Sequence, residues 1–259
     1  MYRGLSFFLI FLFIAVINGY SAPILKGNSI AVKIDHSLWE QLLKKHVSAN
    51  GKVDYAGFKS DSKKLDSYLK MLSNTNLSGY SKTEKQAYWI NAYNAFTVDL
   101  VAKNYPVKSI KDIRNAKSLV AKATGGSQVW IEKLRYSFDG EELSLYNIEN
   151  KKLLKDLFDP RIHFVINCAS YSCPRLLNKA YTTGNLENLM NQMAGEFIND
   201  HTKNNITSSS AMISEIFKWY KGQFTRNGSL IDFLNKYSTV KIKPNVEIKF
   251  LEYNWALNE

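Results

Sequence analysis

The chain has 259 residues, of which 45% are hydrophobic and 13% aromatic, and its formal net charge is +11. This composition excludes a disordered protein, because it supplies enough apolar surface for a core. A basic net charge is compatible with an anionic envelope polymer or lipid head groups as a partner, although an ordinary solvated lysine-rich surface is the preferred explanation. The densest basic segment, residues 103–122, lacks the interleaved aromatic side chains that stack on bases, so no nucleic acid partner is expected.

Residues 1–21 have the pattern of a cleavable signal peptide. Arg3 precedes an apolar run that ends at Ile17, and the small residues Gly19 and Ser21 occupy the −3 and −1 positions of a cleavage site after Ser21. The alternative is an uncleaved anchor, but the run is shorter than the roughly 20 residues that span a bilayer. We expect residues 22–259 to form a single globular domain that is exported, periplasmic or secreted, with no transmembrane segment in the mature chain.

Helices dominate the prediction for the first half of that domain. Apolar spacing indicates helices over residues 37–47 and 65–72, with a turn at 51–55 between them. Ser81 and Glu84 form a capping box, which begins a long helix that stops before Pro106.

The long helix is apolar on nearly every side, which is typical of a buried helix. Its polar residues Glu84, Asn91 and Asn94 are therefore expected in the interior, pointing toward the segment around His163.

The second half predicts a mixture of helices and strands. Residues 129–138 alternate loosely, and Asp139-Gly140 predicts a hairpin. Ser144 caps a helix over residues 145–157, and residues 162–167 read as a short strand buried on both faces. Further helices are expected over residues 186–200, 213–220 and 230–237, and one or two strands over 240–253. The fold class is α+β: a helix-rich single domain with a small sheet and a central buried helix.

The segment DPRIHFVINCASYSCPRL combines a histidine, an amide and two thiols. Strand alternation places His163 and Asn167 on one face and Cys168 on the other. Pro174 predicts the first turn of a helix, whose amide dipoles would lower the pKa of the Cys173 thiol. Together these groups can serve as nucleophile, base and orienter.

The same residues also admit structural interpretations. An even cysteine count in an exported protein favours a disulfide between Cys168 and Cys173, while a redox pair and inert buried thiols are alternatives. His163 can be a hydrogen-bonded core histidine, and the polar residues of the long helix a satisfied buried network. A metal site is not expected, because no fourth ligand is visible near His163 and the two cysteines. No cofactor is expected either.

Five motifs resemble those of the domain-of-unknown-function family 547, in the same order: EKQAYWINAYNAF, YSFDGEELSLYNIE, DPRIHFVINCASYSCPRL, FKWYKGQF and LEYNWALN. With VDYAGF, the resemblance covers residues 38–258. It implies no particular reaction, but it favours one shared site built from the polar residues of these motifs. The positions that match are Glu84, Trp89, Asn91, Tyr93, Asn94, Ser144, Glu149, His163, Asn167, Cys168, Cys173 and Pro174. Asn254 departs from the pattern, in which an acidic residue is expected.

Two functions are open at this point. The first is a thiol-dependent hydrolase or acyl transferase acting on an envelope peptide or related amide, with an Asn as orienter or oxyanion donor. The second is a non-catalytic module that binds envelope material and is shaped by a local Cys168–Cys173 disulfide. The candidate catalytic residues are Cys173, Cys168, His163, Asn91 and Glu84, and the further site residues are Asn94, Asn167 and Glu149.

Overall fold

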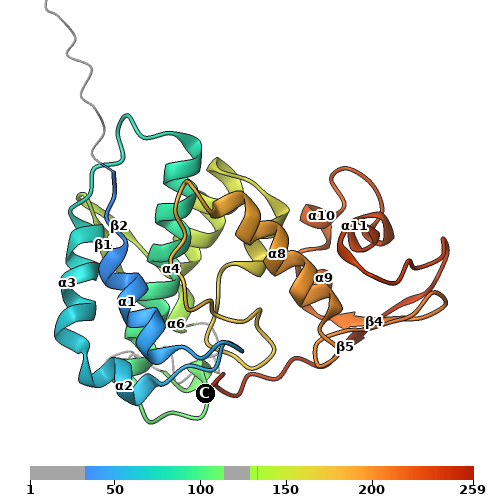
Figure 1. Ribbon diagram of the computed structural model, residues 1–259, viewed down its shortest axis with the longest axis horizontal. Coiled ribbons are helices and arrows are strands. Elements are labelled where there is room, and N and C mark those ends of the chain that lie inside the picture. The colour runs from blue at the N-terminus through green and yellow to red at the C-terminus, as the bar shows by residue number, and fades with distance from the viewer. Residues whose placement is uncertain (1–32, 114–128, 133) are drawn as a thin grey trace, which may run out of the picture. The chain divides into compact units, whose positions relative to one another are not determined.

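The computed structural model describes residues 33–113, 129–132 and 134–259 (Figure 1). These residues belong to one compact unit, Val32–Glu259. The predicted signal, residues 1–21, and the later part of the basic segment, residues 114–122, lie outside the described residues. Within the described residues, no helix is long and apolar enough to cross a bilayer.

The predicted central helix is present as α4 (Lys82–Asn104), and every residue from Gln86 to Ala102 on it is buried. Its capping box forms as expected, because Ser81 accepts from the Glu84 amide and the Glu84 carboxylate accepts from the Ser81 amide. α4 ends at Asn104, just before the Tyr105–Pro106 step. The core of the unit therefore forms around one helix that is buried on all sides.

Three N-terminal helices lie on one side of α4: α1 (Ser37–His46), α2 (Tyr55–Ser60) and α3 (Ser62–Ser73). α2 and α3 pack directly on α4, and α1 packs on α3 and α2. Apolar spacing predicted α1 and α3. α2 was not predicted, although Asp54 caps it by accepting from the Gly57 amide.

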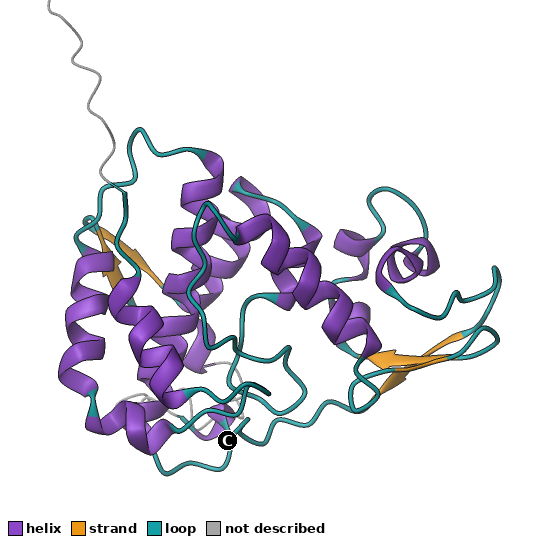
Figure 2. Cartoon of the chain, in the orientation of Figure 1, coloured by secondary structure: helices purple, strands orange, loops and turns teal. Residues whose placement is uncertain are grey.

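Among the described residues, strands form two small sheets, and helices make up most of the rest (Figure 2). The hairpin predicted at Asp139-Gly140 joins β1 (Tyr136–Phe138) to β2 (Glu141–Leu143). In the second sheet, β4 (Ala211–Ser214) pairs antiparallel with β3 (Asn205–Ile206) and parallel with β5 (Ile248–Leu251). Helix-rich α+β architecture is thus confirmed.

The strand predicted over residues 162–167 is wrong. The segment begins with the short helix η3 (Pro160–Phe164) and continues as an irregular, buried loop. Asp159 accepts from the Arg161 amide, and Pro160 occupies the first helical position, so the Asp-Pro pair starts a helical turn. The alternating faces assigned to His163, Asn167 and Cys168 therefore do not exist.

Two other boundaries differ from the prediction. Ile213 and Ser214 belong to β4, because that segment pairs with β5, and the expected helix begins only at α9 (Ile216–Trp219). Within the loosely alternating residues 129–138, the first four form a helical turn instead of a strand. The remaining elements are η1 (Ile110–Asp112), α6 (Val129–Glu132), α7 (Leu145–Asn147), η2 (Ile148–Asp156), α8 (Leu186–Asn199), α10 (Lys221–Phe224) and α11 (Leu230–Tyr237).

Candidate functional site

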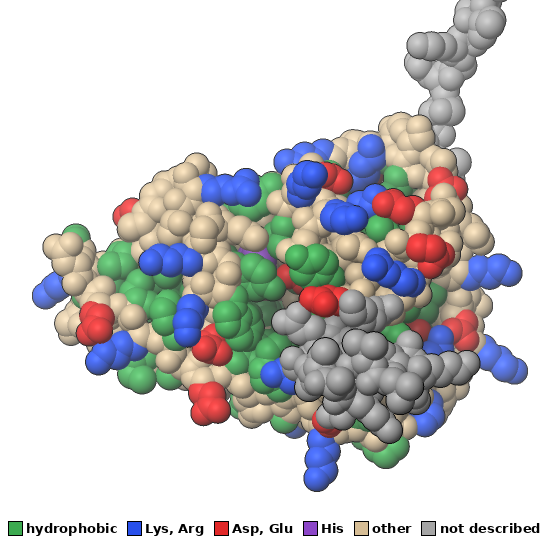
Figure 3. Space-filling model, turned by 180° about the vertical axis from the view of Figure 1, so that it is seen from behind, with side chains coloured by type: hydrophobic (Ala, Val, Ile, Leu, Met, Phe, Trp, Pro, Cys, Tyr) green, Lys and Arg blue, Asp and Glu red, His purple; other side chains and the backbone are tan. Residues whose placement is uncertain are grey.

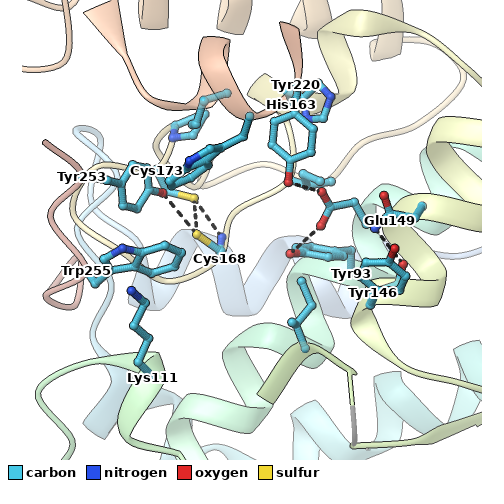
Figure 4. A pocket seen from close by; sticks show the side chains of 16 residues that line it. Tyr93, Lys111, Tyr146, Glu149, His163, Cys168, Cys173, Tyr220, Tyr253 and Trp255 are labelled. Atoms are coloured by element: carbon cyan, nitrogen blue, oxygen red, sulfur yellow. Dashed lines mark hydrogen bonds between the residues drawn. The ribbon is translucent and has the colours of Figure 1, made fainter. Parts of the chain in front are cut away.

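A cavity of about 470 Å³ collects four of the predicted site residues: Glu149, His163, Cys168 and Cys173. Figure 4 shows the two cysteines with Tyr253 on one side of this cavity, and Glu149 with Tyr93 and Tyr220 on the other. The cavity wall is largely aromatic, and its other members include Lys111, Tyr146, Pro174, Trp219 and Trp255. Glu84, Asn91, Asn94 and Asn167 do not line it.

The sulfurs of Cys168 and Cys173 lie 2.7 Å apart, and both residues are free thiols. This separation exceeds the length of a disulfide bond, about 2.05 Å. The backbone amide of Cys168 also donates to the Cys173 sulfur at 3.0 Å. The hydroxyls of Ser170 and Tyr253 lie 3.1 and 3.4 Å from the Cys168 sulfur. Three side-chain groups, the Cys173 thiol and the Ser170 and Tyr253 hydroxyls, thus lie within hydrogen-bonding distance of the Cys168 sulfur and can donate to it.

These contacts make the two thiols unequal. The hydrogen bond from Cys173 lowers the pKa of Cys168 to about 7, with smaller contributions from Ser170 and Tyr253 and against the effect of burial. Burial, followed by the hydrogen bond to Cys168 and the charge on it, raises the pKa of Cys173 well above its ordinary value. Cys168 is also the more exposed of the two. The directions of these two shifts thus favour Cys168 as the thiolate of the pair.

The helix expected to begin at Pro174 does not form. The chain is irregular after Cys173, and the next helix, α8, begins at Leu186. The helix dipole that was expected to activate Cys173 is therefore absent, in agreement with the raised pKa of that thiol.

Asn94 and Asn167 hold the cysteine loop in place. Asn94 on α4 accepts from the Asn167 amide at 2.8 Å and donates to the Val165 carbonyl at 2.9 Å. The Asn167 side chain donates to the Pro174 carbonyl at 2.7 Å and accepts from the Ala169 amide at 2.8 Å. Ala169 has a φ of +62°, which these contacts stabilise. Both amides are thus committed to positioning the loop, and neither reaches a sulfur as orienter or oxyanion donor.

The motif LEYNWALN closes the loop from the other side. Ser170 forms a β-bridge with Leu257, and the Tyr171 amide donates to the Ala256 carbonyl at 2.6 Å. Tyr253 of this motif reaches the Cys168 sulfur. Asn254, the departure from the expected acidic residue, accepts from the Ala256 amide in a local turn, a contact that an amide oxygen makes as well as a carboxylate.

His163 lies on the cavity wall without a hydrogen bond to either sulfur. Its Nε2 lies 2.5 Å from Oε1 of Gln223, and its ring stacks on Tyr220 with centroids 3.8 Å apart. Burial lowers the pKa of His163 to about 4. These contacts are those of a neutral, hydrogen-bonded core histidine and give no support to its predicted role as the base for a cysteine.

Glu149 on η2 is a buried carboxyl group between two phenols. The Tyr220 hydroxyl donates to one of its oxygens at 2.7 Å, and the Tyr93 hydroxyl to the other at 3.4 Å. Burial raises the pKa of Glu149, and the two tyrosine hydrogen bonds only partly oppose it. Such a carboxyl group is suited to exchange a proton with a ligand in the cavity.

Asn91 and Glu84 serve other parts of the fold. Asn91 exchanges two hydrogen bonds with the backbone of Tyr181, at 2.7 and 3.0 Å. Glu84 caps the start of α4 and is not buried in the interior. It is therefore not part of the shared site that was expected to include it. Of Glu84, Asn91 and Asn94, only Asn94 contacts the segment that follows His163.

Sequence reasoning missed several residues of the cavity. Four of them lie in the motifs FKWYKGQF and LEYNWALN: Trp219, Tyr220, Tyr253 and Trp255. Their place in these motifs was the sequence feature from which they could have been predicted. Lys111, whose ammonium lies 3.8 Å from the centroid of the Trp255 ring, had no such signal. Burial lowers the pKa of Lys111. Within the described residues, no three His, Cys, Asp or Glu side chains group to hold a metal ion.

Lys and Arg side chains occur across the face shown in Figure 3, several of them close together near its upper edge, with Asp and Glu among them. This mixture of charges on that face is typical of a solvated surface.

Comparison with known proteins gives one match. The model of the family described as "Protein of unknown function, DUF547" matches residues 77–198, which include α4, Glu149, His163 and both cysteines. No curated protein and no solved structure matches the chain. Over the residues that build the core of the site, the protein therefore resembles the DUF547 family.

Proposed function

We propose that the protein is a thiol-dependent hydrolase or acyl transferase in which Cys168 is the nucleophile. The observation that supports this most is the position of the Cys168 sulfur. It lies at the wall of a 470 Å³ cavity and is surrounded by the Cys173, Ser170 and Tyr253 donors that stabilise a thiolate. Cys173, the other nucleophile that the sequence left open, is the weaker candidate because its pKa is raised.

The proposed first step is attack of the Cys168 thiolate on a carbonyl carbon. A carbon–sulfur bond forms, and the bond from that carbon to the leaving nitrogen or oxygen breaks. Glu149 is the proposed proton donor to the leaving group, because its raised pKa favours the protonated form. Lys111, which lines the same cavity, is suited to stabilise negative charge on the carbonyl oxygen.

The second step returns the enzyme to its starting state. The Glu149 carboxylate takes a proton from water or from an acceptor amine, whose oxygen or nitrogen then attacks the thioester carbon. The carbon–sulfur bond breaks, and the Cys168 thiolate is released. Glu149 thus replaces His163 as the proposed acid and base.

We further propose that the protein acts outside the cytoplasm on an envelope peptide or related amide. The support is the signal-like pattern of residues 1–21, together with a cavity that has aromatic walls for side chains. N-terminal sequencing of the protein from its native host tests the export, because a chain that retains Met1 contradicts it.

An acyl reporter tests the nucleophile. With p-nitrophenyl acetate, the reduced wild-type protein should release a burst of p-nitrophenolate and carry one acetyl group on Cys168 in a peptide map. The burst rate should rise with pH around a midpoint of about 7.

Two variants complete this test. Cys168→Ser should lose the burst while keeping its thermal melting point. Glu149→Gln should still be acetylated but should lose the acetyl group about 100-fold more slowly. Acetylation of lysines alone, with Cys168 unmodified in folded protein, would reject the proposal.

A further inference from the structure

We propose a second activity for this site: dithiol–disulfide exchange, with Cys168 as the attacking thiol and Cys173 as the resolving thiol, on peptide disulfides flanked by apolar side chains. This inference stands on the geometry of the two sulfurs and does not depend on acyl transfer.

The two sulfurs can form a bond with little movement. They lie 2.7 Å apart, so a displacement of about 0.7 Å brings them to the length of a disulfide. The loop that carries them is fixed at both ends, by Asn167 bonded to the Pro174 carbonyl and by the bridge of Ser170 to Leu257. The same loop conformation therefore serves both the dithiol and the disulfide state.

The two thiols differ in pKa and in exposure, as the attacking and resolving thiols of an exchange reaction should. An attacking thiol is most effective when its pKa is near the ambient pH, and Cys168 meets this condition. A resolving thiol should stay protonated and shielded until it is needed, and Cys173 is only 7% exposed. Access and protonation thus both assign the first attack to Cys168.

The first step joins Cys168 to the substrate. The Cys168 thiolate attacks one sulfur of the substrate disulfide, a new sulfur–sulfur bond forms, and the other substrate sulfur leaves as a thiolate. In the second step, deprotonated Cys173 attacks the Cys168 sulfur, and the remaining substrate sulfur leaves. Two electrons pass from the protein dithiol to the substrate disulfide, and the substrate thiolates take up the Cys173 proton and one from water. A second dithiol returns the protein to its reduced form.

Formation of the mixed disulfide itself activates Cys173. After burial, the hydrogen bond to Cys168 and the charge of that residue are what hold the pKa of Cys173 high. Both are removed once Cys168 is in a neutral disulfide, and the Cys168 backbone amide, which donates to the Cys173 sulfur at 3.0 Å in the dithiol form, opposes the effect of burial. The first step therefore removes two of the three causes that raise the pKa of Cys173, and it favours formation of the resolving thiolate.

The cavity wall indicates the kind of disulfide. Trp219, Tyr253 and Trp255 form a cluster beside the sulfurs, with ring centroids 4.6 to 5.9 Å apart. Trp219 is 45% exposed, so this cluster is open to a ligand. Apolar and aromatic side chains next to the reacting disulfide would pack on these rings.

The aromatic disulfide 5,5′-dithiobis(2-nitrobenzoate) tests the proposal on the full, reduced protein. Wild type should release two equivalents of thionitrobenzoate and finish with an intramolecular Cys168–Cys173 disulfide and no adduct by intact mass. Cys173→Ser should release one equivalent and keep a stable mixed disulfide on Cys168. Cys168→Ser should react at least about tenfold more slowly, because only the shielded thiol remains.

Ser172→Ala is the matched control, because it removes a loop contact to Asn254 without touching a sulfur, and it should behave as wild type. Thermal melts check that each variant is folded. A wild-type product that carries one or two adducts and no internal disulfide overturns the exchange activity. Acetylation of Cys168 by the ester reporter is measured separately, so either activity can fail while the other stands.

Discussion

The Asn94 side chain forms two hydrogen bonds with the backbone between η3 and the cysteine loop. It accepts from the Asn167 amide at 2.8 Å and donates to the Val165 carbonyl at 2.9 Å. Asn91, less than one turn earlier on α4, makes the same pair of contacts with Tyr181. One buried helix thus fixes two irregular segments by the same means.

The two asparagines form a matched pair for mutation. Asn94→Leu should lower the free energy of unfolding by about 2–4 kcal/mol, because it leaves two buried backbone groups unpaired. Asn91→Leu should cost a similar amount. Only Asn94→Leu should also change the rate at which Cys168 is alkylated, since only Asn94 holds the cysteine loop. Urea unfolding and iodoacetamide kinetics measure both effects, and equal alkylation in the two variants contradicts the positioning role.

The alkylation rate of Cys168 should depend on pH in a defined way. The thiolate fraction rises with pH around a midpoint of about 7 in the wild type. Cys173→Ala should move this midpoint upward most, because the hydrogen bond from Cys173 is the largest stabilising contact, and Tyr253→Phe should move it upward less. Mass mapping after each pH point assigns the reaction to Cys168. A midpoint that stays near 7 in Cys173→Ala would be inconsistent with the geometry.

His163 should affect stability at acid pH and leave the thiols unchanged. Its pKa in the folded protein, about 4, is below the ordinary 6.5, so protons bind the unfolded chain more tightly. The stability that its neutral form contributes is complete above pH 6.5 and is lost as the pH falls toward 4. His163→Gln should therefore lose less stability between pH 7 and pH 4.5 than wild type does. His36, whose pKa is also lowered to about 4 by burial, contributes in the same direction and remains in the variant.

The Cys168 alkylation midpoint should be the same in His163→Gln and wild type. A raised midpoint in the variant would restore His163 as a partner of the thiolate.

Glu149 should make the free energy of unfolding depend on pH in the opposite direction. Its pKa in the folded protein is raised, so its neutral form favours folding below the ordinary value of 4.5, and this contribution is lost as the pH rises through the folded pKa. Glu149→Gln keeps a neutral group at all pH values. Its free energy of unfolding should therefore fall less than that of wild type between pH 5 and pH 8. Urea titrations at the two pH values measure the difference, and parallel losses would mean that Glu149 titrates as in water.

Local signals in the sequence predicted much of the fold. The capping box at Ser81, the Asp139-Gly140 turn and the apolar spacing of α1, α3 and α8 are all short-range features, and each is present. The buried run at residues 162–167 gave no periodicity to separate a strand from a helical turn. There the Asp-Pro pair decided the local structure.

The site was predictable only in part, for a related reason. His163, Cys168 and Cys173 were recognised as residue types in one segment, and all three line the cavity. Some of the contacts that adjust their chemistry come from far along the chain, from Gln223 to His163 and from Tyr253 to Cys168. No pattern of spacing contains such pairings, so the roles of imidazole, carboxyl group and thiols could be assigned only from the structure.

The pairing of the cysteine loop with residues 253–258 also has a consequence for the order in which the site is made. During synthesis, Cys168 and Cys173 leave the ribosome about 85 residues before Tyr253 and Leu257, the residues that close over them. Until then, neither the tyrosine donor nor the Ser170 bridge exists, so the nascent chain lacks one of the contacts that lower the pKa of Cys168. The difference between an attacking and a resolving thiol is thus complete only after residues 253–257 have been translated and have packed on the loop.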